Sequence, residues 1–172
     1  MLPVPGTPPP AEVSVDAALV RRLLTEQQPD LAALDVALVA EGWDNVMFRL
    51  GGDMLVRLPR RALAANLVVH EQTWLPRLAP SLSIPIPAPI RCGRPAAGYP
   101  WHWSVLPWIP GTNALETPLH DSQARQLGRF LSELHAIDLP REPPHNPYRG
   151  GPLADRRETD AERLQRLAAS GV

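Results

Sequence analysis

The sequence contains no lysine, because all 17 of its basic residues are arginine. This absence excludes mechanisms that need a lysine amine, such as a P-loop lysine or a Schiff base with a carbonyl substrate. Cys92 is the only cysteine, so the chain forms no internal disulfide and suits a reducing compartment. We expect this lone thiol to be a small buried hydrophobic side chain.

Excess charge and long apolar runs are also missing. The formal net charge is −1, so no broad basic field indicates nucleic acid as a partner. No stretch approaches the ~20 apolar residues that span a bilayer, and the N-terminus lacks the charged start and apolar run of a secretory signal. We expect a soluble cytoplasmic protein without a membrane or nucleic-acid partner.

Proline, by contrast, is abundant, with 22 residues in 172. The prolines cluster at 3–10, 76–89, 95–118 and 140–152, which indicates short elements joined by stiff connectors. The first cluster predicts a flexible tail over residues 1–13. A proline-rich ligand for a partner domain is the alternative interpretation of this tail.

Periodicity predicts a helix, three strands, a second helix and two further strands between residues 14 and 108. Ser14 is the expected N-cap of the first helix, whose apolar stripe runs to about Gln28. Alternating patterns and turn residues predict the remaining elements: strands at 36–41, 46–50 and 54–58, a helix at 62–78, and a hairpin of 89–93 with 99–108. The fold class is therefore α+β, with a five-stranded antiparallel sheet crossed by a helix.

The C-terminal third has a different organisation. Residues 109–118 predict a connector, and Thr117 is the expected cap of a helix over 119–136 with Pro118 at its first position. A proline- and glycine-rich loop at 140–152 and a charged helix at 153–169 follow. The predicted domains are a tail (1–13), a lobe (14–108), a linker (109–118) and a helical part (119–172).

Glu71 is the first candidate site residue. It lies four residues after Leu67 and four before Leu75, inside the apolar stripe of its helix, where an unpaired carboxylate is costly. Arg57, on the strand before this helix, is the candidate partner. Kinases use a strand cation and a helix carboxylate to hold the α- and β-phosphates. An ordinary structural ion pair, or a Glu71 that reaches solvent, fits the spacing as well.

Two further segments are candidates for contacts with a nucleotide. The turn Gly42-Trp43-Asp44-Asn45, one hairpin ahead of Arg57, occupies the position of a phosphate-binding loop, although the local residues by themselves favour a plain β-turn. The segment from Leu106 to Gly111 leaves a strand and offers backbone groups to a base edge. Because Pro107 and Pro110 have no N–H, a donor there must come from Trp108 or Ile109. A strand end with aromatic packing is the alternative.

These pieces together resemble the aminoglycoside phosphotransferase family, bacterial small-molecule kinases with a protein-kinase-like fold. The resemblance covers roughly residues 14–140. The segments that carry it are Glu41–Asn45, Phe48–Leu50, Val56–Arg61, Glu71-Gln72, Trp74–Ala79, Trp103–Val105, Trp108–Gly111, Leu127–Leu131 and Leu134-His135.

The resemblance implies a nucleotide-binding lobe that takes ATP or GTP. Arg57 stands where kinases usually carry a lysine, with Glu71 as its partner, and the family's hinge maps onto Leu106–Gly111. The nucleotide-binding residues that it implies are Gly42, Trp43, Asp44, Asn45, Arg57, Glu71, Leu106, Trp108 and Ile109. The intact family would use Mg²⁺ to transfer a phosphoryl group to a hydroxyl of a small molecule.

The sequence departs from the family in two ways. Its loop at 42–45 is poor in glycine. No His-Gly-Asp or His-Arg-Asp followed by Asn occurs, and no Asp-Phe-Gly-like turn does, so we assign no catalytic residue and no metal ligand. We expect an N-terminal, truncated part of such an enzyme, without turnover by itself. Self-association through the exposed face of helix 119–136 is a further expectation. The alternative function is a non-catalytic binding module that uses the sheet and the proline-rich segments.

Overall fold

The computed structural model describes residues 9–112, 114, 116, 117, 120–139, 152, 154 and 157–169. The chain divides into two compact units, Met1–Ile137 and Asp138–Val172. The first holds, in chain order, α1 (Ala17–Gln27), a 3₁₀ turn (Pro29–Leu31), β1 (Val36–Glu41), β2 (Asn45–Leu50), β3 (Met54–Pro59), α2 (Ala62–Leu78), a second 3₁₀ turn (Ala79–Ser81), β4 (Arg91–Gly93), β5 (Trp103–Pro107) and α3 (Asp121–Ala136).

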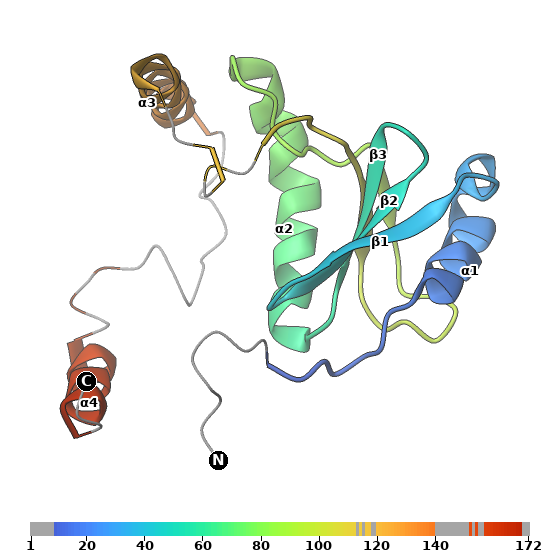
Figure 1. Cartoon of the computed structure of the whole chain (residues 1–172), viewed down its shortest axis with the longest axis horizontal. Coiled ribbons are helices and arrows are strands. Elements are labelled where there is room, and N and C mark those ends of the chain that lie inside the picture. Colours follow the sequence, from blue (N-terminus) through green and yellow to red (C-terminus); the bar gives the residue numbers. More distant parts are fainter. Residues whose placement is uncertain are drawn as a thin grey trace. The chain divides into compact units, whose positions relative to one another are not determined.

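The five strands form one antiparallel sheet in the order β1-β2-β3-β5-β4 (Figure 1). Short turns join the first three strands. Leu50 pairs with Met54 across the turn 51–53, and Gly51 there has a φ of +58°, which favours glycine. Strand β5 lies between β3 and β4 and completes the sheet. The predicted α+β fold class with a five-stranded antiparallel sheet is confirmed.

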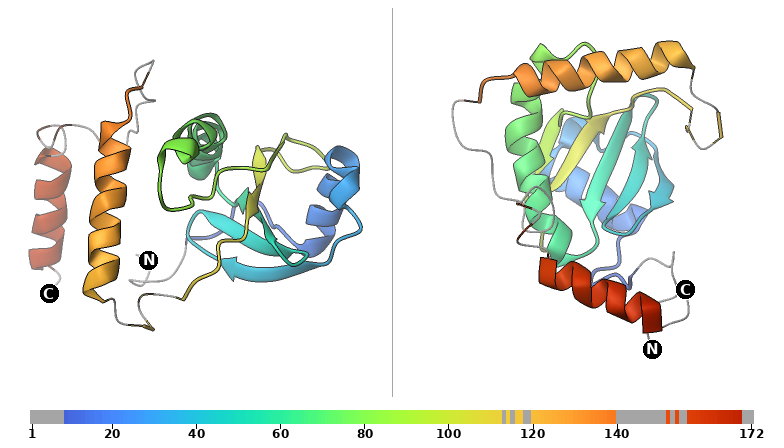
Figure 2. Two further views of the ribbon diagram at one scale, coloured as in Figure 1. Left: turned by 90° about the horizontal axis from the view of Figure 1, so that it is seen from above. Right: turned by 90° about the vertical axis from the view of Figure 1, so that its left-hand side faces the viewer.

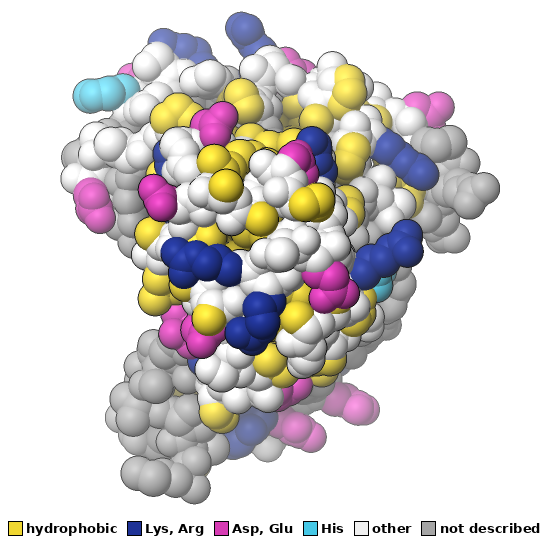
Figure 3. Space-filling model, turned by 90° about the vertical axis from the view of Figure 1, so that its right-hand side faces the viewer, with side chains coloured by type: hydrophobic (Ala, Val, Ile, Leu, Met, Phe, Trp, Pro, Cys, Tyr) yellow, Lys and Arg dark blue, Asp and Glu magenta, His cyan; other side chains and the backbone are white. Residues whose placement is uncertain are grey.

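Helix α1 covers one face of the sheet, and α2 lies on the opposite face (Figures 1 and 2). Four apolar residues of α1 are buried against even-numbered residues of β2 and β3 in the main core. They are Leu19, Val20, Leu23 and Leu24, and each contributes about 1.5–3 kcal/mol to the hydrophobic stabilisation when fully buried. Figure 3 shows this side of the molecule, where arginine and acidic side chains alternate among apolar ones.

The N-cap of α1 differs from the prediction. Asp16, not Ser14, caps the helix, since its Oδ1 accepts a hydrogen bond of 2.7 Å from the N–H of Leu19. The helix therefore begins at Ala17. Serine and aspartate both make good N-caps. Asp16 is the cap here because it lies three residues before Leu19, the spacing at which an N-cap side chain accepts a bond from the helix backbone.

Helix α2 presents a narrower apolar face than its sequence suggests. Ala64 and Val68 are its buried residues, whereas Leu63, in its first turn, is 43% exposed. Pro76 lies inside the helix, which continues to Leu78. The Gln72 side chain donates to the backbone oxygen of Trp103 (2.8 Å) and to Oγ of Ser104 (3.0 Å), so it ties α2 to β5.

The second hairpin is shorter than predicted. Its strands are Arg91–Gly93 and Trp103–Pro107, while Ala96 and Tyr99 form an isolated bridge at the turn. Tyr99 leaves the strand pattern because its side chain enters the core, where its hydroxyl donates to the carbonyl of Pro59 (2.8 Å). Cys92 is exposed, not buried as we expected, because β4 is a three-residue strand at the sheet edge.

Helix α3 begins at Asp121, with His120 as its N-cap residue and not Thr117. The N–H of His120 donates to the Gln123 side chain (2.8 Å), and Pro118 lies outside the described residues. The Glu133 carboxylate accepts a hydrogen bond from the N–H of Ser83 (2.8 Å), which holds its pKa below the ordinary value. None of the described α3 side chains is buried.

The second unit contributes α4 (Arg157–Ala169), within the helix predicted over 153–169. The loop predicted at 140–152 falls almost entirely outside the described residues. Among the helices that the structure describes, none has the length and apolar character to cross a membrane.

Candidate functional site

Arg57 and Glu71 form an ion pair between β3 and α2. Nη2 of the guanidinium contacts Oε2 of the carboxylate, and the side chains are only 16% and 32% exposed. Burial lowers the pKa of Arg57 below its usual range, and the adjacent carboxylate offsets part of that desolvation. The predicted pairing is confirmed. Its use in nucleotide binding stays a prediction.

The guanidinium keeps bonding capacity beyond this pair. Its Nε is buried and has no hydrogen-bond partner within the described part of the chain. A buried donor without a partner in a native protein calls for an explanation, and an anionic oxygen brought by a ligand is one. Arg57 therefore combines a carboxylate that holds its side chain with a donor that remains open.

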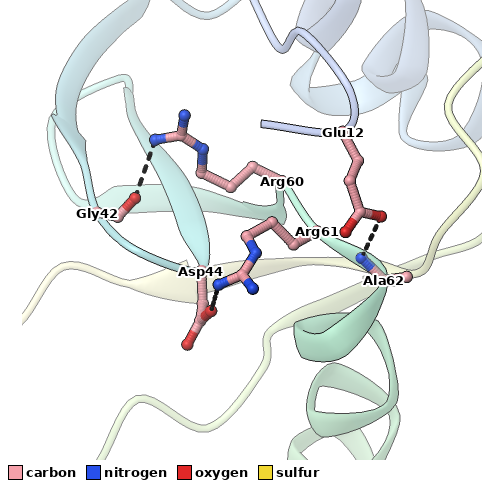
Figure 4. Close-up of polar contacts among 6 residues, drawn as sticks. All are labelled: Glu12, Gly42, Asp44, Arg60, Arg61 and Ala62. Atoms are coloured by element: carbon pink, nitrogen blue, oxygen red, sulfur yellow. Dashed lines mark hydrogen bonds and ion pairs between the residues drawn. The ribbon is translucent and has the colours of Figure 1, made fainter. Parts of the chain in front are cut away.

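The turn at 42–45 is held rigidly by the residues that follow β3 (Figure 4). Arg60 donates from Nη1 to the Gly42 oxygen (3.0 Å) and pairs with the Glu41 carboxylate (2.8 Å), and its own N–H bonds the Asp44 oxygen (2.9 Å). Arg61 pairs with the Asp44 carboxylate at 3.4 Å. The turn also closes on itself, since the Gly42 N–H donates to the Asn45 oxygen (2.9 Å).

Two donors of this turn are left open. The N–H groups of Trp43 and Asp44 have no hydrogen-bond partner among the residues that the structure describes. The Trp43 side chain is 56% exposed, and Oδ1 of Asn45 is buried without a described partner. A turn with engaged carbonyls and free N–H groups suits an anion.

The structure decides which donor the segment after β5 can offer. The Trp108 N–H is already used, because it donates to the Asp53 oxygen (2.8 Å) and extends the β3–β5 ladder. Ile109 therefore keeps the only open N–H of the two candidates; within the described chain it has no partner. Backbone groups alternate along a strand, so the Pro107 carbonyl and the Ile109 N–H face away from β3.

Arg49 is a residue that the sequence did not single out. Its guanidinium stacks on the Trp108 ring with Cζ at 3.8 Å from the ring centroid, and it also donates to the carbonyls of Gly51 and Gly52. The β2–β3 turn thus holds the start of the connector through a side chain as well as through the backbone. Neither contact has a signal in the local sequence.

An apolar strip lies beside Arg57, and no local sequence pattern predicted it. Met47 pairs with Arg57, and Leu55 pairs with both Arg49 and Leu106. The alternation of a strand puts these odd-numbered β2 and β3 residues on the side of the sheet that carries α2. Met47 and Leu55 are half-buried and Leu106 is buried, so the open apolar surface of this strip is formed by Met47 and Leu55.

Strand β3 arranges these parts in a row. Its Pro59 end pairs with Asn45 of the turn, and Leu55 pairs with Leu106 at the start of the connector. These two ends are about 13 Å apart at the rise of a strand, and Arg57 lies midway. The predicted site residues therefore line one side of the sheet, with free donors at each end.

The sheet order, the helix across it and the ion pair define the N-terminal lobe of a protein-kinase-like fold. The model of the phosphotransferase enzyme family matches residues 35–171, and the chain belongs to this family. The family that its motifs resemble is thereby confirmed.

Solved structures of aminoglycoside and macrolide phosphotransferases share this fold. The GDP complex of aminoglycoside 2′-phosphotransferase-IIIa has a TM-score of 0.64 at 23% identity, covering 72% of this chain and 43% of that one. The macrolide 2′-phosphotransferase of Brachybacterium faecium gives 0.53 at 23%, covering 70% and 43%. An aminoglycoside phosphotransferase in complex with streptomycin and ATP gives 0.52 at 20%, covering 74% and 42%. No curated protein sequence matches the chain.

Proposed function

We propose that this chain provides the nucleotide-binding lobe of a phosphotransferase that uses ATP or GTP to phosphorylate a hydroxyl of a small molecule. The observation that carries the proposal is the Arg57–Glu71 pair, which keeps an open donor on a buried guanidinium. Family membership and the fold shared with complexes of GDP and ATP support it.

The phosphates would bind between the turn and Arg57. The free N–H groups of Trp43 and Asp44 would donate to phosphate oxygens at one end, and the guanidinium would neutralise charge in the middle. Arginine holds phosphate through a planar fork, whereas lysine acts as a point charge. The residue type at position 57 is therefore compatible with the role.

The base would bind at the other end, against Leu55, which pairs with the buried Leu106. The Pro107 carbonyl is the acceptor there and the Ile109 N–H the donor, and both face away from β3. Adenine presents a donor and an acceptor on its edge in the matching order. Guanine can use the same N–H and the Ile109 carbonyl, so this geometry accommodates either base.

The chain spans about 43% of the length of its structural neighbours. Binding of the acceptor and transfer of the phosphoryl group are therefore part of what we propose for the whole enzyme. Mg²⁺, which the family implies, finds no group of three His, Cys, Asp or Glu residues in the described part of the chain. We expect the 172-residue polypeptide to bind nucleotide weakly and to show no turnover.

Thermal unfolding with and without ATP or GTP tests the proposal. A nucleotide at ten times its Kd should stabilise the fold by about 1.4 kcal/mol, which raises Tm by roughly 3–6 °C. Arg57→Ala should abolish this rise. Arg22→Ala is the matched control, because Arg22 is an exposed arginine of α1 and should keep the full rise.

A second variant separates lost binding from lost folding. Arg57→Ala leaves the Glu71 carboxylate partly buried without its partner, which destabilises the lobe by itself. Combining Arg57→Met with Glu71→Leu removes both charges and fills the space, so the fold should persist while the nucleotide response disappears. A normal response in this double variant would contradict the proposal.

The rival function is a non-catalytic binding module. The observation in its favour is the exposed apolar set on and beside the edge strand β1, formed by Leu38, Val39 and Trp43. This function predicts no thermal shift with any nucleotide. If neither the wild type nor Arg57→Ala shows a change in Tm at any nucleotide concentration, the result would favour the module.

A further inference from the structure

Helix α2 begins without a capping residue of its own. Arg61 is the N-cap residue and makes no side-chain capping bond, and the first turn contains no acidic residue. Such a helix start leaves N–H groups without intrahelical partners and a partial positive charge without compensation. Because Glu71 lies on the same helix, the stability of this end matters for the site.

The cap comes from a distant part of the chain. Oε2 of Glu12 accepts a hydrogen bond of 2.9 Å from the Ala62 N–H (Figure 4). The backbone N–H groups of Glu12 and Val13 also donate to the Arg60 oxygen, at 2.9 and 3.4 Å. Residues 12 and 13, which the sequence assigned to a flexible tail, are thus bonded to the junction between β3 and α2.

The segment that carries Glu12, residues 9–16, is here called the N-terminal strap. It is fixed at its other end as well, because Val13 and Val15 pack against the core and Asp16 caps α1. The backbone on both sides of Glu12 is therefore held in place, which keeps its carboxylate beside the Ala62 N–H. The strap spans from α1 to the start of α2.

The same junction holds the turn at 42–45. Arg60 bonds Gly42, Glu41 and Asp44, and Arg61 bonds Asp44. Three consecutive residues, Arg60-Arg61-Ala62, therefore connect the strap, the turn and α2. A change in the strap therefore reaches both parts of the proposed phosphate site through the contacts of these three residues.

We propose that Glu12 is a positioning residue, which holds the start of α2 and the turn at 42–45 in the arrangement that pairs Arg57 with Glu71. The inference rests on the proposed function where it concerns nucleotide, and on the structure alone where it concerns α2. Glu12 contacts backbone, not ligand. Its effect is to supply a carboxylate to a helix that has none at its start.

Hydrogen exchange of the full 172-residue chain tests the positioning without any ligand. Glu12→Ala should accelerate exchange of the Ala62 amide and of residues 65–68 roughly fivefold, the loss of one cap. Exchange in β5 and α1 should be unchanged. Glu26→Ala, an exposed glutamate of α1, is the control and should leave every rate as in the wild type.

Conservative and compensating variants distinguish positioning from simple stabilisation. Glu12→Gln keeps the acceptor without the charge and should give an intermediate effect. Leu63→Glu, at an exposed position in the first turn of α2, should restore slow exchange in the Glu12→Ala background. Wild-type rates at residues 62–68 in Glu12→Ala would overturn the proposal, and so would acceleration spread evenly over the sheet.

Nucleotide titration completes the test. Glu12→Ala should raise the Kd for ATP or GTP roughly fivefold, and Leu63→Glu should restore it. If Glu12→Ala exchanges faster at the start of α2 but binds nucleotide with an unchanged Kd, the role of Glu12 in the nucleotide site would be overturned. Failure of the wild type to bind any nucleotide would instead reject the proposed function, and the exchange rates would still decide whether Glu12 holds α2.

Discussion

At the scale of single residues, close packing of the sheet favours glycine at position 93. Gly93 of β4 pairs with Trp103, whose side chain is fully buried. A Cβ on Gly93 would lie 1.9 Å from Cε2 of that indole. The glycine is therefore required by packing, since its backbone φ is not in the left-handed region.

Gly93→Ala should reduce the free energy of unfolding by about 1–3 kcal/mol, because the indole cannot move away within a filled core. Urea denaturation of the purified chain measures this change. Gly52→Ala is the control, as a Cβ there meets nothing within 4 Å, and it should change the stability by less than about 0.5 kcal/mol. Equal stability of the two variants would contradict the role of the Trp103 contact.

Tyr99 gives a pH dependence whose sign can be stated. Burial raises the pKa of its phenol above the ordinary value, so the neutral form stabilises the fold fully below the unfolded-state pKa of about 10. This stability is lost as the pH rises above that value toward the folded-state pKa. The hydroxyl that donates to Pro59 is the group concerned.

Tyr99→Phe should cost about 1–3 kcal/mol at pH 7, because the Pro59 carbonyl loses its buried partner. The variant should also lose less stability than the wild type between pH 9 and about pH 11. Denaturant titrations at both pH values check this. A parallel decline of the two proteins would show that another group controls the alkaline transition.

At the scale of elements, helix ends depend on contacts that the helices do not contain. Helix α1 is capped by Asp16, directly before it, whereas α2 is capped by Glu12, fifty positions earlier. The local sequence can therefore predict the cap of α1 but not the cap of α2. The α1 cap itself lies two residues after the one we predicted.

Two substitutions before α1 separate the two candidate caps. Asp16→Ala should lower the free energy of unfolding by about 1 kcal/mol, because the Leu19 N–H loses its acceptor. Ser14→Ala should be close to neutral, as the Ser14 side chain is exposed and has no hydrogen-bond partner among the residues that the structure describes. Thermal denaturation of both variants is sufficient, and a larger loss for Ser14→Ala would reverse the assignment.

At the scale of the whole molecule, α3 carries an apolar face that the described residues of its own unit do not bury. Leu127 and Leu131 are 50% and 42% exposed, and they lie one turn apart on the helix. Exposed apolar faces of this kind favour association. We therefore expect the 172-residue chain to self-associate as its concentration rises.

Sedimentation velocity over a range of concentrations checks this expectation. Leu127→Glu combined with Leu131→Glu should keep the chain monomeric, because the charges face each other in any paired state. Ser122→Glu combined with Ser132→Glu adds the same charge to other exposed positions of α3 and should leave association unchanged. A wild type that stays monomeric throughout would refute the expectation.

Much of the fold and part of the site followed from sequence patterns. Alternation predicted β1, β2 and β3 to within a residue, because their turns contain glycine at the required places. A carboxylate inside an apolar stripe predicted the Arg57–Glu71 pair. The predicted burial of Cys92 was wrong, and the second hairpin forms but is shorter than predicted. The exposure of an edge strand and the entry of Tyr99 into the core depend on neighbours that no local pattern includes.

The sequence by itself determined the α+β class, the order of strands and helices, and the charge pair, because each follows from periodicity or from the cost of burying an unpaired carboxylate. The tertiary structure alone decided that Ile109 and not Trp108 keeps a free N–H, that Arg49 stacks on Trp108, and that Glu12 caps α2. Those contacts join residues far apart in the chain. Their energies depend on distances between atoms that are close only in the folded protein, so no local pattern can predict them.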